Sequence, residues 1–188
     1  MIRALTIGGS AGSFHTITGI LKSIPESFNI PVFLCLHRLK QIRTGFVETL
    51  GVNSKIPLLE PDDKTMIQNG VAYLAPANYH MMIEKDYSIS LAIDEPIHHS
   101  RPSIDLCFSS AADTYGDQLA GILLSGANID GTRGMIELRK NKSFCVIQDP
   151  SDCEIQTMCY SALQQTKPEK LLTSEQIIEF VSLLNNTE

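Results

Sequence analysis

Short runs of apolar residues alternate along the chain with segments of helical periodicity. An uninterrupted apolar run is typical of a parallel strand that is covered on both faces. Such runs predict strands at residues 2–7, 32–36, 56–59, 71–75, 119–124 and 143–147.

The segments between these runs carry apolar residues at helical spacing. They predict helices at residues 13–23, 44–50, 103–115, 132–140, 154–165 and 174–185. Ser103 and Ser174 are expected as N-caps, and Asp105 falls in a first helical turn, where a carboxylate suits the helix dipole.

Residues 81–93 have a different pattern, in which two apolar runs flank the polar residues 84–87. This pattern predicts an antiparallel hairpin. The remaining alternation of strand and helix predicts an α/β fold, with a doubly wound, mostly parallel sheet flanked by helices and right-handed crossovers. We expect one domain over residues 1–188, because no linker or repeat interrupts the pattern.

Composition narrows the function classes. The 188 residues carry a formal net charge of -6, which argues against a nucleic-acid partner. No signal peptide and no apolar run of about 20 residues is visible, so membrane insertion is not expected. The five cysteines form no CxxC pair, which favours a reducing, cytoplasmic location and argues against a metal site. No cofactor motif is apparent, since GxGxxG is not matched.

Polar clusters follow three of the predicted strands, at Ser10, at His37 and at residues 128–130. In open α/β sheets, functional sites lie beyond the carboxyl ends of the strands, near the point where the strand order reverses. We therefore expect these clusters to meet in one site.

Residues 8–12 read Gly-Gly-Ser-Ala-Gly, which fits the GxSxG pattern between a strand and a helix. This pattern makes a nucleophile elbow, in which glycines allow a cramped turn that presents the serine above the sheet. The helix start that follows offers backbone N–H groups to an oxyanion. An ordinary glycine-rich turn that cradles a phosphate is the alternative.

A serine nucleophile needs a base. His37 is the first candidate because it ends a buried strand, and His80, which we place in a turn, is the second. The helical His15 is expected to face solvent, and His98 and His99 fall in a loop.

The base needs an orienting carboxylate. Asp130 lies in the loop after the strand at 119–124, where it could instead be only a helix N-cap. The competitors are Asp113, which we expect on a solvated helix face, Asp117 and Asp149.

These motifs together resemble the catalytic domain of CheB, the chemoreceptor glutamate methylesterase of chemotaxis. The resemblance covers nearly the whole chain in one order. It is carried by residues 7–12, 36–37, 73–76, 80–81, 101–105 and 125–131, and more weakly by 148–163.

The resemblance implies a serine carboxylic-ester hydrolase with a catalytic triad of Ser10, His37 and Asp130. It also implies that the backbone N–H groups of Ala11 and Ala127 hold the oxyanion. The substrate would be a glutamate methyl ester, or a glutamine amide, on a methyl-accepting chemoreceptor or similar signalling protein. No cofactor is implied.

The chain departs from the family pattern around the site. It has Ser-Ala-Gly-Ser at the elbow where the family has Ser-Thr-Gly-Gly, and Gly-Ala-Asn-Ile-Asp-Gly where the family has Gly-Met-Gly-Asn-Asp-Gly. After the histidine it carries Arg38 and Arg43, and with Arg101 these arginines could bind an acidic receptor helix or be solvated surface residues. The family's catalytic domain usually follows a receiver domain, and we do not expect one from this sequence. Two alternatives therefore stay open: a catalytically weak or inactive protein-binding module, and a serine esterase or amidase of another pathway.

Overall fold

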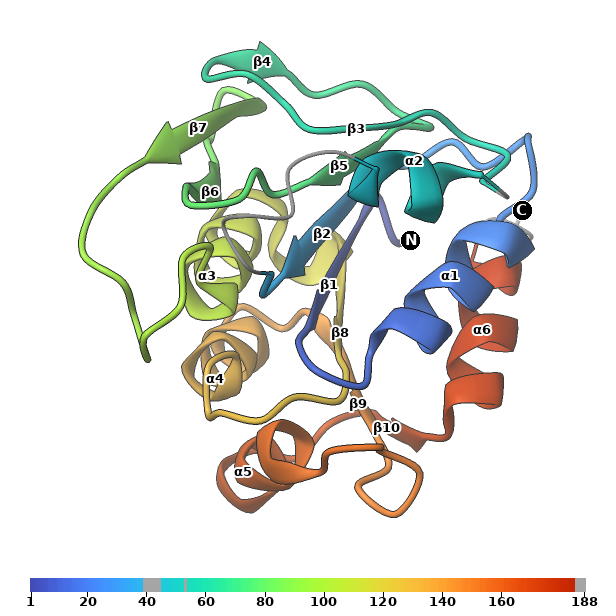
Figure 1. Ribbon diagram of the computed structural model, residues 1–188, viewed down its shortest axis with the longest axis vertical. Helices are drawn as coiled ribbons and strands as arrows, with labels where there is room; N and C mark the ends of the chain where they lie inside the picture. The colour runs from blue at the N-terminus through green and yellow to red at the C-terminus, as the bar shows by residue number, and fades with distance from the viewer. Residues whose placement is uncertain (39–44, 53, 185–188) are drawn as a thin grey trace.

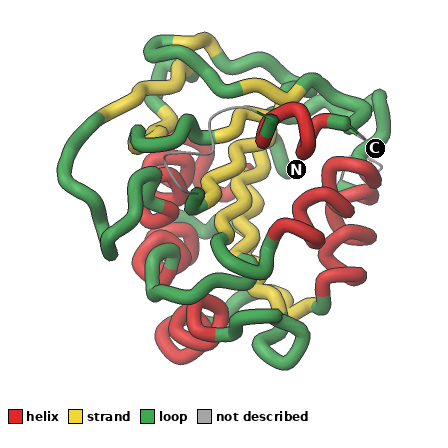
Figure 2. The backbone as a smooth tube through the Cα atoms, in the orientation of Figure 1, coloured by secondary structure: helices red, strands yellow, loops and turns green. Residues whose placement is uncertain are grey.

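The computed structural model describes residues 1–38, 45–52 and 54–184. It confirms the predicted α/β architecture, with helices on both faces of a central sheet (Figures 1 and 2). The helices are α1 (Phe14–Ser23), α2 (Phe46–Gly51), α3 (Ile104–Tyr115), α4 (Thr132–Lys140), α5 (Thr157–Gln165) and α6 (Ser174–Leu183), and a 3-10 turn covers Gly116–Gln118.

The larger sheet has seven strands in the order β10-β9-β8-β1-β2-β5-β3, and every neighbouring pair is parallel. Its strands are β1 (Ala4–Gly9), β2 (Val32–Leu36), β3 (Leu58–Leu59), β5 (Ala72–Leu74), β8 (Leu119–Leu123), β9 (Phe144–Gln148) and β10 (Lys170–Leu172). The chain builds outward from β1 to β2 and then returns to place β8 on the other side of β1. The strand order therefore reverses between β1 and β8, which is where a site is expected.

A small antiparallel sheet lies beside the main one, in the order β4-β7-β6. Its strands are β4 (Thr65–Met66), β6 (His80–Ile83) and β7 (Ser88–Ala92). The predicted hairpin is confirmed as β6 and β7, which pair from His80↔Ala92 to Ile83↔Ile89. The strand β4 adds to β7 and was not predicted.

Two apolar layers hold the helices to the main sheet. Helices α1 and α6 pack together on one face, where Leu5 and Ile7 point into their cluster. Helices α3, α4 and α5 cover the other face, where Phe33 and Cys35 belong to the same buried cluster as Phe108. Side chains of β1 and β2 thus alternate between two buried layers, and this explains why their apolar runs are uninterrupted.

Some sequence expectations need correction at the element ends. The helix expected from residue 154 begins at Thr157. Ser174 is the first helical residue of α6, and the cap is Thr173, whose side chain forms a capping box with Gln176. Ser103 caps α3 as expected, since its hydroxyl accepts a hydrogen bond from the N–H of Leu106.

Candidate active site

Ser10 follows β1 directly and lies in a tightly bonded turn. Its N–H donates to the carbonyl of Ser125 at 2.9 Å, and its carbonyl accepts the Ser13 hydroxyl at 2.7 Å. Gly12 has a φ of +83°, which disfavours any side chain there. A Cβ on Gly9 would come within 2.7 Å of Ser13 Oγ. The backbone of the turn therefore favours glycine at position 12, and the close approach of the Ser13 side chain favours it at position 9.

His37 lies at the end of the neighbouring strand, β2. Its N–H donates to the carbonyl of Gly9 at 3.1 Å, so the backbone of the histidine is tied to the elbow. Its Nε2 lies 2.8 Å from Oδ2 of Asp130. Because an ionised carboxylate only accepts, Nε2 carries the proton, and the lone pair of the neutral imidazole is on Nδ1.

Asp130 is fully buried and is held by the start of α3. Its Oδ2 also accepts the N–H of Ile104 at 2.7 Å, and its Oδ1 accepts the Ser103 hydroxyl and the N–H of Asp105, each at 3.0 Å. The carboxylate thus lies at the N-terminus of α3, where the helix dipole favours negative charge. It does not cap the helix that follows it in sequence, because the N-cap of α4 is Gly131.

Burial alone would raise the pKa of the Asp130 carboxyl. The hydrogen bonds from His37 and from the backbone at the start of α3 outweigh burial, so the pKa lies below its usual value. Asp105 is the opposite case, because burial and the nearby Asp130 raise its pKa. The two adjacent carboxyls are thereby distinguished, and Asp130 is the one favoured as an anion.

The structure brings Ser10 and His37 to the same cavity but does not join their side chains. Within the described ranges, Ser10 Oγ makes no hydrogen bond to His37. The partner of His37 Nδ1 is instead the hydroxyl of Ser100, at 3.2 Å. Hydrogen bonds in an unliganded site are commonly looser than in the reacting complex.

Two backbone N–H groups near Ser10 are free to bind an anion. Among the described residues, neither Ala11 nor Ala127 donates its N–H to a partner. The loop that carries Ala127 is anchored by Gly126, whose N–H donates to Ile155 and whose carbonyl accepts from Met158.

The cavity at these strand ends has a volume of ≈ 790 Å³, which is typical of a site that binds a small ligand or a side chain.

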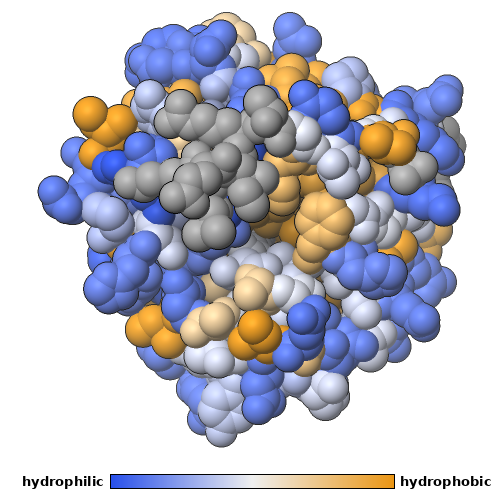
Figure 3. All heavy atoms as spheres, viewed as in Figure 1, coloured by the Kyte–Doolittle hydropathy of each residue, from blue (hydrophilic) through white to orange (hydrophobic). Residues whose placement is uncertain are grey.

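 It is lined on its apolar side by Phe14, Ile17, Leu36 and Phe46. The rings of Phe14 and Phe46 lie 5.9 Å apart. Figure 3 shows a hollow near the middle of this face of the molecule, with hydrophobic residues along one side. Ser10 therefore opens onto a space large enough for a side chain and its neighbours.

Arg38 also lines this cavity, but its guanidinium is bound within the protein. It pairs with Glu60, donates to the carbonyl of Ala75 at 3.2 Å, and lies 5.2 Å from the ring centre of Phe46. Burial lowers its pKa. Its Nε and Nη1 have no partner among the described residues. Arg38 is thus not a solvated surface arginine, and its contact with substrate stays a prediction. Arg43 lies outside the described residues.

Arg101 ties together the loop that borders the cavity. Its Nε and Nη2 donate to Asn78 Oδ1 at 3.2 and 2.8 Å, and its Nη1 donates to the carbonyls of Ile93 and Asp94. Most of its donors are therefore used within the protein, and a direct role in substrate binding stays a prediction.

The other candidate bases are placed differently from His37. His80 begins β6 rather than lying in a turn, and it is fully buried. Its Nδ1 accepts the N–H of Ser103 at 3.1 Å and its Nε2 lies 3.2 Å from the carbonyl of Glu95. Both ring nitrogens are thus occupied. His15 is exposed on α1 as expected, and His98 lies 3.6 Å from Asp105.

The competing carboxylates do not reach His37 in the described part of the chain. Asp113 and Asp117 are exposed, and Asp149 accepts hydrogen bonds within its own turn, from the N–H and the hydroxyl of Ser151. Asp130 is therefore the carboxylate that the fold pairs with the histidine.

Sequence reasoning missed Ser100 and the way in which α3 holds Asp130. Ser100 lies in a loop without periodicity, so no pattern indicated that it reaches His37. The segment Pro102-Ser103-Ile104-Asp105 was part of the family resemblance, and a motif at a helix start is a signal that a carboxylate could be bound there.

Metal-binding groups, disulfides and membrane-spanning helices are all absent from the described residues. Within the described ranges, no group of three or more His, Cys, Asp or Glu side chains is arranged to hold a metal ion. The five cysteines are free thiols. In the part of the chain that the structure describes, no helix is long and apolar enough to cross a membrane.

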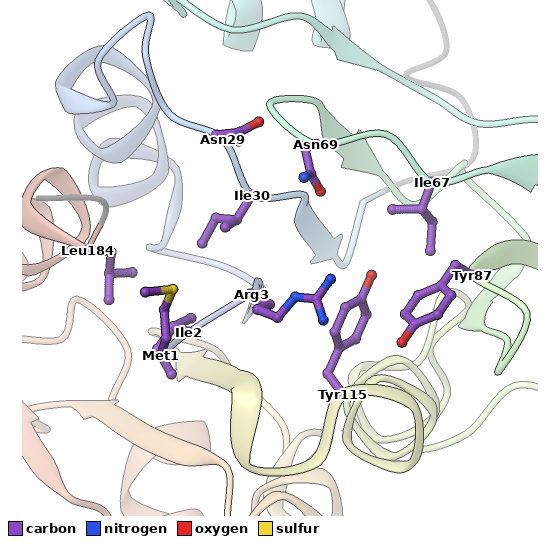
Figure 4. A pocket seen from close by; sticks show the side chains of 10 residues that line it. All are labelled: Met1, Ile2, Arg3, Asn29, Ile30, Ile67, Asn69, Tyr87, Tyr115 and Leu184. Atoms are coloured by element: carbon purple, nitrogen blue, oxygen red, sulfur yellow. The ribbon is translucent and has the colours of Figure 1, made fainter. Parts of the chain in front are cut away.

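A second cavity of ≈ 410 Å³ lies near the amino ends of β1 and β2, away from Ser10. Figure 4 shows the Arg3 guanidinium there, beside the ring of Tyr115, with the ring of Tyr87 beyond it. Burial raises the pKa of Tyr115 to about 12. None of Ser10, His37 and Asp130 lines this cavity.

Comparisons with known proteins identify the family of the chain and its fold. The model of the family described as CheB methylesterase matches residues 5–181. A putative protein-glutamate methylesterase/protein-glutamine glutaminase of Leptospira interrogans is 38% identical over 184 residues, covering 97% of this chain and 95% of that protein. A protein-glutamate methylesterase/protein-glutamine glutaminase of Clostridium acetobutylicum is 27% identical, and the match covers 95% of this chain but 52% of that longer protein.

Among solved structures, the catalytic domain of the Thermotoga maritima CheB methylesterase superposes with a TM-score of 0.91. The match covers 98% of this chain and 99% of that domain at 21% identity, so it shows the shared fold. Together with the family match and the Leptospira relative, the comparisons establish that this chain belongs to the CheB methylesterase family.

Proposed function

We propose that this chain hydrolyses glutamate methyl esters on chemoreceptor-type proteins, with Ser10 as nucleophile, His37 as general base and Asp130 as the orienting carboxylate. The observation that carries the proposal is the 2.8 Å hydrogen bond between His37 and Asp130, at the cavity that Ser10 lines. The names of the relatives supply the substrate class.

The reaction begins when Ser10 Oγ attacks the ester carbonyl and gives its proton to Nδ1 of His37. The imidazolium that forms is stabilised by Asp130, whose lowered pKa keeps it ionised. The negative charge on the carbonyl oxygen is bound by the free N–H groups of Ala11 and Ala127.

Collapse of this intermediate breaks the ester bond, and His37 returns the proton to the departing methanol. A water molecule then attacks the acyl-enzyme with His37 as base, the bond to Ser10 Oγ breaks, and His37 returns the proton to Oγ as the glutamate side chain is released. A glutamine side chain would follow the same steps with ammonia as the leaving group. No step requires a metal or a cofactor.

The proposed partner is a chemoreceptor or a similar signalling protein, with the reaction in the cytoplasm. Free thiols suit a reducing compartment, and the net charge of -6 disfavours nucleic acid as a partner. Arg38 and Arg101 line the cavity and remain our candidates for contact with an acidic substrate segment.

One observation favours a second candidate function, that of a protein-binding module with little activity. Among the described side chains, Ser10 Oγ has no hydrogen bond to His37, and Ser100 occupies Nδ1. A binding module would capture a receptor without releasing methanol from it.

The test is covalent labelling with a fluorophosphonate probe, followed by peptide mapping. We expect the label on Ser10, and we expect Ser10→Ala to abolish it. The matched control is Ser182→Ala on α6, whose hydroxyl bonds, among the described residues, only to the carbonyl of Glu179. A label on Ser100, or no label on a folded wild-type chain, would contradict the proposal.

A further inference from the structure

We propose that Ser100 is a positioning residue that competes with Ser10 for Nδ1 of His37, so that the base is blocked in the resting protein and is released when substrate enters the cavity. This inference rests on the proposed function. Its core is a contact that the mechanism above does not use, the 3.2 Å hydrogen bond from Ser100 Oγ to Nδ1.

The direction of this hydrogen bond follows from its neighbours. Nε2 of His37 donates to Asp130, so Nδ1 can only accept. The side-chain amide of Asn128 donates its Nδ2–H to Ser100 Oγ at 3.1 Å. Oγ therefore accepts from the amide and directs its own proton at Nδ1, since the alternative acceptor, the carbonyl of His98, is 3.5 Å away.

Four side chains form one hydrogen-bonded chain around the base. Asn128 Oδ1 accepts the backbone N–H of Asp130 at 3.1 Å, so Asn128 is tied to the same residue that supplies the carboxylate. Proton donation thus runs from Asn128 to Ser100, then to His37, and then to Asp130. Such a network holds the imidazole ring from both of its nitrogens.

A neutral imidazole nitrogen has one lone pair in the plane of the ring, so Nδ1 accepts one donor at a time. Ser10 Oγ needs this same lone pair in order to lose its proton during attack. Both serines line the cavity in which substrate would bind. Ser100 must therefore leave Nδ1 before Ser10 can react.

The backbone of Ser100 is held in a strained turn beside the cavity, so rotation of its side chain about Cα–Cβ would release the hydroxyl from Nδ1. Ile97 and Ser100 form an isolated β-bridge, and the two residues between them, His98 and His99, have φ values of 47° and 62°. Positive φ angles of this kind are unfavourable for residues other than glycine. Arg101 fixes the following end of the loop. The turn is thus strained between two anchored ends, next to the open cavity.

The first test is the rate at which the fluorophosphonate probe labels Ser10 in the full chain. Ser100→Ala should raise this rate roughly five-fold, the effect expected from losing one competing neutral hydrogen bond. Ser100→Thr, which keeps the hydroxyl, should restore the wild-type rate, and Ser182→Ala should leave it unchanged. An equal or lower rate in a folded Ser100→Ala variant would overturn the proposal.

The second test reads the contact directly and does not involve Ser10. The ¹⁵N resonance of Nδ1 in His37 should move when its donor is removed by Ser100→Ala, and it should stay in place in Ser182→Ala. An identical resonance in wild type and Ser100→Ala would overturn the proposal. A wild-type chain that never reacts at Ser10 contradicts the proposed function instead, so the two failures are distinguishable.

Discussion

His37 and Asp130 are joined by a hydrogen bond of 2.8 Å between Nε2 and Oδ2, although 93 positions separate them in the chain. The same carboxylate binds the first backbone N–H groups of α3. One buried anion therefore both orients the candidate base and stabilises a helix terminus. A substitution at Asp130 should therefore affect both activity and stability.

Asp130→Asn should reduce ester hydrolysis by about 10⁴-fold, because the histidine loses the group that sets its tautomer. It should also lower the free energy of unfolding by about 1–3 kcal/mol, since buried donors lose an acceptor. Hydrolysis assays and urea unfolding measure the two effects. Near-normal hydrolysis by this variant would contradict the role of Asp130.

The stability lost in Asp130→Asn should depend on pH. The folded-state pKa of Asp130 is lowered, so its stabilisation is present above the unfolded pKa of about 3.9 and is lost as pH falls through the folded value. Urea unfolding at a series of pH values should show the wild-type advantage shrinking in acid. An advantage that grows in acid would contradict the lowered pKa.

Asp105→Asn should have the opposite effect on stability. Burial raises the folded-state pKa of Asp105. Its contribution to the free energy of unfolding is therefore fully present below the unfolded pKa and is lost as the pH rises through the folded-state pKa. The asparagine keeps an oxygen for the N–H groups of Gly131 and Gly134. We expect this variant to be more stable than wild type at neutral pH, with no gain in acid, and unfolding curves at both pH values check this.

Gly126→Ala should disturb the elbow. A Cβ at this position would lie 2.5 Å from the Cε of Met158 and 3.0 Å from the Cβ of Ser10. The end of the Met158 side chain is flexible and can partly move aside. We therefore expect the overpacking to lower the free energy of unfolding by a moderate amount, about 1–3 kcal/mol. Displacement of Ser10 should slow its labelling about 10- to 100-fold.

The matched control for Gly126→Ala is Gly51→Ala at the end of α2. A Cβ there would meet only Leu58, at 3.8 Å or more, which is ordinary contact. The control should label at the wild-type rate. Equal labelling by the two variants would show that the space around Gly126 does not position Ser10.

His80→Ala should reduce stability more than reactivity. The change removes both hydrogen bonds of a fully buried ring and leaves the N–H of Ser103 unpaired. We expect a cost of about 1–3 kcal/mol from the unpaired group alone. The folded fraction should still label at Ser10, whereas His37→Ala should not. Loss of labelling as complete as in His37→Ala would instead favour His80 as the base.

The fold could be predicted wherever a strand or helix carries its own pattern. Buried runs such as Val32–Leu36 and the periodicity of α1 were sufficient to identify the parallel sheet and its covering helices. The strands β4 and β10 were missed. The first has only two residues, and the second is an edge strand with exposed residues, so neither has a continuous apolar run.

The candidate site could be predicted as far as strand ends determine it. Ser10 and His37 each follow a buried strand, and Asp130 lies in the loop after β8. The contact of Ser100 with His37 joins residues that are 63 positions apart in the chain, and no local pattern encodes that approach. The binding of Asp130 at the start of α3 likewise depends on how α3 and α4 pack together.

The most direct test of the central claim is methanol release from a methylated chemoreceptor by the wild-type chain and by Ser10→Ala. Small methyl esters should be assayed in parallel, to separate receptor specificity from general esterase activity. We predict release by wild type, with a preference for the receptor, and loss of release in Ser10→Ala at unchanged stability. Equal release by both chains, or none by a folded wild type, would contradict the account.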